Sequence, residues 1–192
     1  LETIYLGRNL DYNASRRYGY SPFYNKKSLC SIMTGEKVNS IKMYAFYKCD
    51  EISSLTINSG VLSIESNAFS TLNKVIWLTN TPPTGYANTK GNINYVANDQ
   101  YTKLSNVMVY PHLNSIFEVD GVRFVPVSPS ERTCHAIDCV YENSIETINI
   151  GETTSFKGIA MKVVEVLPYT FYNNSYIKNA SISHLGNIIL MY

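Results

Sequence analysis

Apolar residues recur along the first part of the chain at a step of 23 positions. Phenylalanine shows this most simply, because Phe23, Phe46 and Phe69 are evenly spaced. Other apolar residues repeat at the same step: Leu29, Ile52 and Val75; Ile32, Leu55 and Leu78; Val38 and Val61; Ile41 and Ile64; Ala45 and Ala68. Self-similarity at a fixed step is typical of repeat proteins, in which each unit buries its apolar edge only against its neighbours. The pattern therefore predicts a solenoid of stacked coils.

Each unit also contains a short strand motif, which is an apolar residue, two spacers, an apolar residue, one spacer, and an apolar residue or Thr. It occurs at Leu1-Ile4-Leu6, Leu29-Ile32-Thr34, Ile52-Leu55-Ile57, Leu104-Val107-Val109, Ile145-Ile148-Ile150 and Ile177-Ala180-Ile182, and in part at Val75-Leu78. Because its alternating end is typical of a strand, we expect a ladder of parallel strands. Ala45-Phe46 and Ala68-Phe69 are interpreted as short helical turns that bring Phe into the core. The alternative is a β-sandwich with accidental spacing.

The repeat lapses over 80–104, a stretch rich in Pro, Gly and Asn that is too long for a plain connector. The segment 107–111 after it is predicted to be a terminal strand. Asp120-Gly121 and Lys157-Gly158, each flanked by apolar residues, predict two hairpins. We therefore expect two repeat blocks. One covers 1–112 and includes the excursion at 80–104, and the other covers 113–192 and opens with a β-meander before further coils.

The segment 38–78 resembles the BspA-type leucine-rich repeats of bacterial surface proteins, which carry an Ala-Phe pair, a Cys three residues on, and then the apolar strand motif. Ala45-Phe46 with Cys49 matches, whereas Leu72 and Asn174 stand at the Cys place of two other units. The resemblance covers 1–80 and 145–192. It implies a β-rich leucine-rich-repeat solenoid of coils of ~23 residues, with a buried thiol at Cys49. It also implies a cell-surface or extracellular location and a role in adhesion.

Composition narrows the class of partner. Sixteen Lys and Arg against fifteen Asp and Glu give a net charge of +1, and charged residues are 16% of the chain. No basic surplus indicates nucleic acid as a partner. No apolar run approaches the ~18 residues of a membrane helix, so no membrane insertion by this segment is expected. Leu1 begins in mid-pattern without Met, which indicates an excised or processed portion of a longer protein.

Cys134, His135, Asp138 and Cys139 form the one cluster that resembles a metal or nucleophile site. On a strand over 133–140 the two cysteines, five positions apart, would lie on opposite faces, so that both could not bind one ion. The spacing is also not the CxxC of a zinc ribbon. We interpret the cluster as structural, and expect no metal, no cofactor and no enzymatic activity. A zinc site or a Cys/His-dependent enzyme is the alternative.

Residues that alternate with the inward strand positions are expected to face outward along the sheet. This face is predicted to be polar and uncharged, with a few aromatic or soft apolar side chains that suit a protein or glycan ligand: Tyr5, Met33, Trp77 and Met108. The alternative for Trp77 is burial beneath 80–104.

The first unit, from Leu1 to Leu29, is five positions longer than the next, which indicates an insertion within 11–22. The insertion gathers residue types that dominate interface hot spots into one loop, and we expect it to contribute to binding: Tyr12, Arg16, Arg17, Tyr18 and Tyr20. The alternative is a Tyr-rich flap that packs on its own coil.

The sequence thus predicts a non-enzymatic binding module that recognises a host or neighbouring-cell surface protein or glycan. End-to-end self-association through an open terminal coil is a further expectation. The alternative function is that of a structural spacer or stalk that carries another domain.

Overall fold

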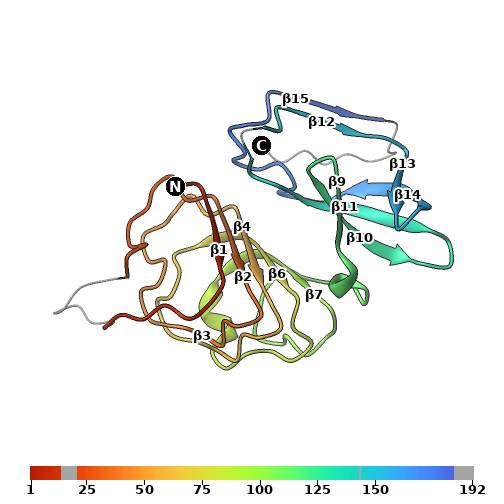
Figure 1. Ribbon diagram of the computed structural model, residues 1–192. Helices are drawn as coiled ribbons and strands as arrows, with labels where there is room; N and C mark the ends of the chain where they lie inside the picture. Colours follow the sequence, from red (N-terminus) through yellow and green to blue (C-terminus); the bar gives the residue numbers. More distant parts are fainter. Residues whose placement is uncertain (14–20, 143, 184–192) are drawn as a thin grey trace. The chain divides into compact units, whose positions relative to one another are not determined.

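The computed structural model describes residues 1–13, 21–142 and 144–183, which form mainly short strands and turns (Figure 1). Close approaches between Cα atoms divide the chain into two compact units, Leu1–Val109 and Tyr110–Tyr192. Each unit has its own cluster of buried hydrophobic side chains.

The first unit is a solenoid with a parallel sheet along one side. In the described part of the chain this sheet has six strands in the order β1 (Thr3–Leu6), β2 (Ser31–Thr34), β4 (Ser54–Ile57), β6 (Leu72–Trp77), β7 (Gly91–Val96) and β8 (Val107–Val109). Neighbouring strands are parallel because a full turn of chain separates them. The predicted parallel ladder and the solenoid fold are confirmed (Figure 1).

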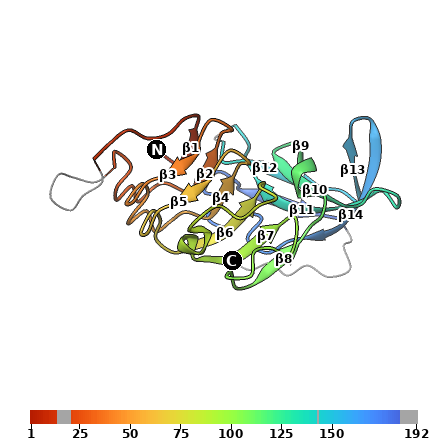
Figure 2. The ribbon, with the colours of Figure 1, turned by 90° about the horizontal axis from the view of Figure 1, so that it is seen from below.

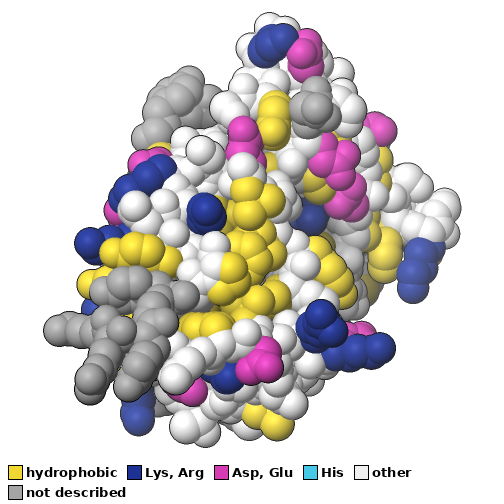
Figure 3. All heavy atoms as spheres, turned by 60° about the vertical axis from the view of Figure 1, so that its left-hand side comes forward, with side chains coloured by type: hydrophobic (Ala, Val, Ile, Leu, Met, Phe, Trp, Pro, Cys, Tyr) yellow, Lys and Arg dark blue, Asp and Glu magenta, His cyan; other side chains and the backbone are white. Residues whose placement is uncertain are grey.

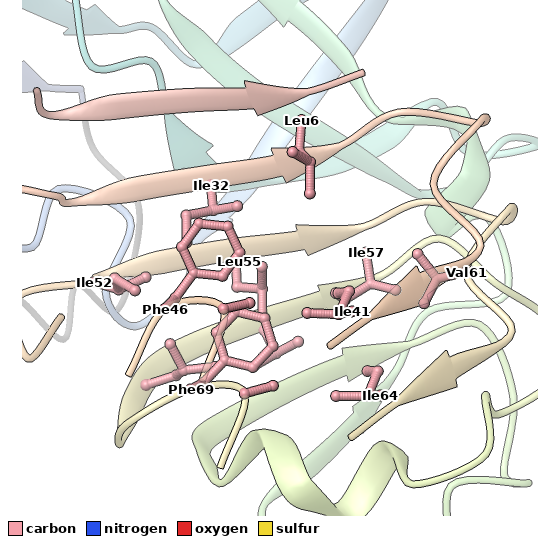
Figure 4. Close-up of a cluster of buried hydrophobic side chains, with 14 of the residues drawn as sticks. Leu6, Ile32, Ile41, Phe46, Ile52, Leu55, Ile57, Val61, Ile64 and Phe69 are labelled. Carbon is pink, nitrogen blue, oxygen red and sulfur yellow. The ribbon is translucent and has the colours of Figure 1, made fainter. Parts of the chain in front are cut away.

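A second, shorter wall lies opposite the sheet. It contains β3 (Ser40–Ile41) and β5 (Ser63–Ile64), which pair in parallel (Figure 2). Val38 and Val61 precede these strands and are buried, as are Ile41 and Ile64. The two walls therefore enclose the apolar core that stacked coils were predicted to form (Figure 4).

Phenylalanine rings fill the side of the core between the walls. Phe46 stacks on Phe23 with ring centroids 5.5 Å apart and an interplanar angle of 14°. It also stacks on Phe69, at 5.5 Å and 9°, and Figure 4 shows these last two rings side by side. Phe46 and Phe69 each follow a turn that starts in the left-handed region, with φ of 62° at Tyr44 and 54° at Asn67. The predicted stack of Phe side chains at the regular step of the repeat is thus present.

The coils become shorter along the stack. Strand register pairs the inward-facing residues in one continuous row, whose members come progressively closer together in the sequence: Ile4, Ile32, Leu55, Val75, Asn94 and Val107. The expectation that Val75 and Leu78 continue the phase of Ile52 and Leu55 is therefore wrong. Leu55 comes nine positions after Phe46, but Val75 comes only six positions after Phe69. This shortening shifts the register of β6 against β4 by three positions, so that Val75 rather than Leu78 pairs with Leu55.

The stretch 80–104 is not an excursion outside the repeats. It contains the 3₁₀ helix η1 (Tyr86–Thr89) and the strand β7, which pairs with β6 on one side and β8 on the other. This stretch is therefore a further coil of the same sheet. The predicted terminal strand corresponds to β8, the last strand of the sheet.

The second unit contains a mixed sheet whose five strands, in the described residues, follow the order β13 (Thr153–Phe156), β14 (Ile159–Val166), β11 (Thr133–Cys139), β10 (Val122–Ser128) and β9 (Phe117–Val119). A 3₁₀ helix, η2 (Leu113–Ser115), precedes β9. Asp120-Gly121 and Lys157-Gly158 join antiparallel pairs, with φ between 50° and 79° at all four residues. Such positive φ values are those of a type I′ turn, and both predicted hairpins are confirmed.

A parallel strand pair like those of the first unit recurs in the second unit, with the hairpin of β13 and β14 between its two strands. Strands β12 (Thr147–Ile150) and β15 (Asn179–Ile182) pair in parallel, as expected of the last two strand motifs. Before β15, Phe171 occupies a turn with φ of 62° at Tyr169 and 54° at Asn173, as Phe46 does between Tyr44 and Lys48. Ile148 and Ile150 are buried in the core of this unit.

Candidate binding surface

Strand register places six side chains in one row across the outer face of the first unit's sheet: Tyr5, Met33, Thr56, Ile76, Tyr95 and Met108. Three of the residues predicted to bind ligand, Tyr5, Met33 and Met108, are thus aligned. None of the six carries a charge. The neighbouring outer row includes Lys74. The face was predicted to be uncharged, and this part of the prediction is wrong.

The two ends of this row are its accessible parts. Tyr5 on β1 is 67% exposed, and Met33 and Met108 are half-buried. Thr56, Ile76 and Tyr95 are buried. A ligand on this face would therefore meet Tyr5 and Met33 at one end or Met108 at the other.

Trp77 does not belong to this surface. Because the register of β6 is shifted, Trp77 pairs with Ile57 and faces the core, where it is fully buried. Its ring centroid lies 5.1 Å from that of Tyr101 and 6.4 Å from that of Tyr86, and its Nε1 donates to Oδ1 of Asn94 at 3.3 Å. The prediction that Trp77 binds ligand is wrong, and the alternative of burial beneath 80–104 describes its position.

Trp77 is the one tryptophan of the chain, so fluorescence reports its surroundings directly. We expect blue-shifted emission that iodide quenches weakly in the folded protein, and a red shift on unfolding, because water does not reach the buried indole. Steady-state emission with iodide titration measures this. Free tryptophan is the control, and quenching at the rate of free tryptophan would contradict the burial.

Tyr12, in the inserted loop, packs on the next coil. Its Oη donates to the carbonyl of Met43 at 2.7 Å, and Nζ of Lys42 lies 5.7 Å from its ring centroid. Burial, with a smaller effect of the Glu65 charge, raises the pKa of Tyr12 to about 12. This one contact is with the next coil, so it does not test the alternative of a flap packed on its own coil. The predicted binding residues Arg16, Arg17, Tyr18 and Tyr20 lie outside the described residues.

The cysteine cluster lies on β11, and 133–140 was predicted to be a strand. The two cysteines, however, do not lie on opposite faces of this strand as expected. Ile137 forms a bulge, since Phe124 pairs with Ala136 and Arg123 with Asp138. The bulge brings Cys134 and Cys139 to the same face, opposite Pro126 and Val122. These two partners are four positions apart on β10, or about 13 Å along the strand, too far for two cysteines to share one ion.

Burial shifts the pKa values of two side chains of the cluster, Cys134 and His135. Burial raises the pKa of Cys134 to about 12, so its thiol is protonated at neutral pH. His135 accepts or donates a hydrogen bond at 3.0 Å with Oη of Tyr110, lies 3.4 Å from Oε2 of Glu165, and has its pKa lowered by burial. Among the described residues, no group of three His, Cys, Asp or Glu side chains is arranged to hold a metal ion.

The Cys position of the repeat has a defined structural role. Sγ of the buried Cys49 donates to the carbonyl of Phe23 in the preceding coil at 3.0 Å. In the second unit Nδ2 of Asn174 donates to the carbonyl of Val140 at 2.9 Å. Asn is therefore a substitute for Cys as the donor that links one coil to the next.

A parallel-stranded solenoid with these turns is the architecture of a leucine-rich-repeat protein. The family model of the BspA type leucine-rich repeat region matches six copies over residues 13–116, and the chain belongs to this family. Comparisons with curated proteins and with solved structures found no match. In the described residues, no helix combines the length and the apolar character needed to cross a membrane.

Proposed function

We propose that the chain is an adhesion module of a bacterial cell surface that binds a protein or glycan of a host or neighbouring cell. Repeats of this family are typically non-enzymatic scaffolds and are generally found on bacterial surface proteins. The observation that carries the proposal is the uncharged outer row, which presents Tyr5 and Met33 from two adjacent strands. Tyrosine is enriched among residues that anchor interfaces.

The solenoid favours binding because its face is already ordered. Tyr5 and Met33 are paired in register, and the strands that carry them are held by a core in which Ile4 and Ile32 are buried. A ligand therefore orders few side chains when it binds, which reduces the entropic cost of association.

An array of host-matrix proteins and glycans tests this function with the whole chain. We expect the double variant Tyr5→Ala with Met33→Ala to reduce capture of a ligand about tenfold or more, because anchor residues supply most of the binding energy. Leu62→Ala is the control, since Leu62 is 68% exposed but belongs to the opposite wall. A variant pair with Arg16→Ala and Arg17→Ala tests the inserted loop in the same way.

The spacer function makes the opposite prediction for this array. A stalk that only carries another domain captures no ligand, and substitution of Tyr5 and Met33 then changes nothing. If the wild-type chain captures a ligand and all the variants capture it equally well, the outer row is not the binding surface.

A further inference from the structure

Tyr5 lies along the outer face of the sheet over two glycines. A Cβ atom on Gly35 would lie 2.5 Å from Oη and 3.0 Å from Cζ of Tyr5, and one on Gly7 would lie 3.6 Å from Cε1. The ring thus extends from the end of β1 toward the end of β2, whereas strand side chains usually stand roughly perpendicular to a sheet. With 67% of the residue exposed, a large part of the ring is open to a ligand.

The backbone does not require glycine at position 35. Its φ lies outside the left-handed region, so any L-residue could adopt it. Atoms of Tyr5 are the two nearest to a Cβ at this position, and the third, Cα of Gly7, is 3.4 Å away. The absence of a side chain at position 35 therefore leaves space for the ring of Tyr5.

An open cleft begins at Leu6, the residue after Tyr5, and Gly7 both lines this cleft and lies close to the ring of Tyr5. Its volume is about 570 Å³ and its lining is continuous in sequence: Leu6, Gly7, Arg8, Asn9, Leu10 and Asp11. Oδ1 of Asn9 accepts from the backbone N–H groups of Asn39 and Ser40 at 2.9 and 3.2 Å, which ties the cleft wall to the next coil. Arg8 and Asp11 are exposed. This volume lies within the range of about 300–1,000 Å³ that is typical of sites for small ligands.

We propose that Tyr5 and the Gly7–Asp11 cleft form a site for a neutral hexopyranose unit of a glycan. This inference rests on the proposed binding function and narrows its ligand class. The exposed ring supplies an apolar surface for the C–H face of a sugar, as amphipathic aromatic side chains do at interfaces. Arg8 supplies donors and Asp11 acceptors for hydroxyl groups, which act as both.

The charge distribution favours a neutral ligand. Arg8 and Asp11 have opposite charges, and Nζ of Lys42 lies 3.9 Å from Oδ1 of Asp11, so charges of both signs surround the cleft and offset one another in part. The outer residues nearest to Tyr5 on its own strand and on β2 are Thr3, Ser31 and Met33, all uncharged. On the face shown in Figure 3, basic and acidic side chains are interspersed around hydrophobic ones.

Saturation-transfer NMR tests the site with four proteins and three probes, the methyl glycosides of glucose, galactose and N-acetylglucosamine. We expect saturation transfer from the wild-type chain to at least one glycoside. Tyr5→Ala should weaken its binding about tenfold, whereas Tyr5→Phe keeps the ring and should stay within about threefold. Leu62→Ala, which removes an exposed side chain elsewhere, should leave binding unchanged.

Gly35→Ala tests whether the position of the Tyr5 ring matters for binding, because it leaves the ring itself in place. The added methyl group displaces the tip of Tyr5, so glycoside binding should fall while the unfolding temperature stays at the wild-type value. No saturation transfer to any glycoside, or equal binding by Tyr5→Ala and wild type, would overturn the sugar site. If the array shows capture that depends on Met33 but no glycoside binds, the adhesion function stands and the sugar site is rejected. If a glycoside binds but the array shows no capture, the sugar site stands and the adhesion function is rejected.

Discussion

Replacement of Phe46 by alanine is expected to lower the free energy of unfolding of the first unit by about 3–5 kcal/mol. The ring is fully buried, and it contacts Phe23 on one side and Phe69 on the other. Its backbone N–H donates to the carbonyl of Ala68 at 2.7 Å, and such bonds between coils hold their spacing. The neighbouring coils therefore cannot close the cavity that the substitution leaves.

Urea unfolding followed by the emission of Trp77 measures this effect, because the tryptophan belongs to the same core. Phe23→Ala is the matched control. Phe23 is half-buried and is stacked on Phe46 alone of the three rings, so we expect about half the loss of stability. A cost below about 1 kcal/mol for Phe46→Ala would mean that the stacked rings do not support the solenoid.

Replacement of Gly60 by alanine should also destabilise the first unit strongly, by about 3 kcal/mol. A Cβ at this position would lie 2.0 Å from the carbonyl oxygen and 2.7 Å from the carbonyl carbon of Glu36, and 3.1 Å from the oxygen of Val38. All three are backbone atoms of the preceding coil and cannot rotate away. The substitution therefore forces two successive turns apart, next to Val61 of the second wall.

Gly7→Ala provides the comparison for this effect, measured by the same unfolding experiment. Its Cβ would meet only Cε1 of Tyr5 at an ordinary contact distance of 3.6 Å. We expect a change within about 0.5 kcal/mol. Equal stabilities of the Gly60→Ala and Gly7→Ala variants would show that the close approach of successive turns does not exist in solution.

Much of the fold could be predicted from the sequence because each coil meets its neighbours at equivalent positions. Phe23, Phe46 and Phe69 stack because residues at one step of a repeat lie above one another. The hairpins at Asp120-Gly121 and Lys157-Gly158 could be predicted equally well, since two successive positive φ values need residues that tolerate them.

The phase of β6 could not be predicted in this way. Val75, Ile76, Trp77 and Leu78 are four consecutive apolar residues, so the sequence allows either Val75 or Leu78 to lie beside Leu55. The loss of three positions after Phe69 decides in favour of Val75, and it places Trp77 in the core. A binding residue predicted from the wrong phase thus proved to be a packing residue.

Two other features depend on contacts that local sequence does not indicate. The bulge at Ile137, which reverses the face of Cys139, arises from pairing with β10. The outward position of Tyr5 follows from strand alternation and was predicted, but the space above Gly35 depends on how β1 pairs with β2.

The shortening of successive coils toward β8 limits how this protein can gain or lose repeats during evolution. Between β2 and β4 one coil has the regular step of the repeat, and a duplicate of it could be spliced in with both flanking contacts preserved. Toward β8 the intervals between paired strands become steadily shorter, so each of these coils fits only its own neighbours. In relatives with more repeats, we therefore expect the additional coils near β2 and β4, where the coils are long, and not near β8, where they are short.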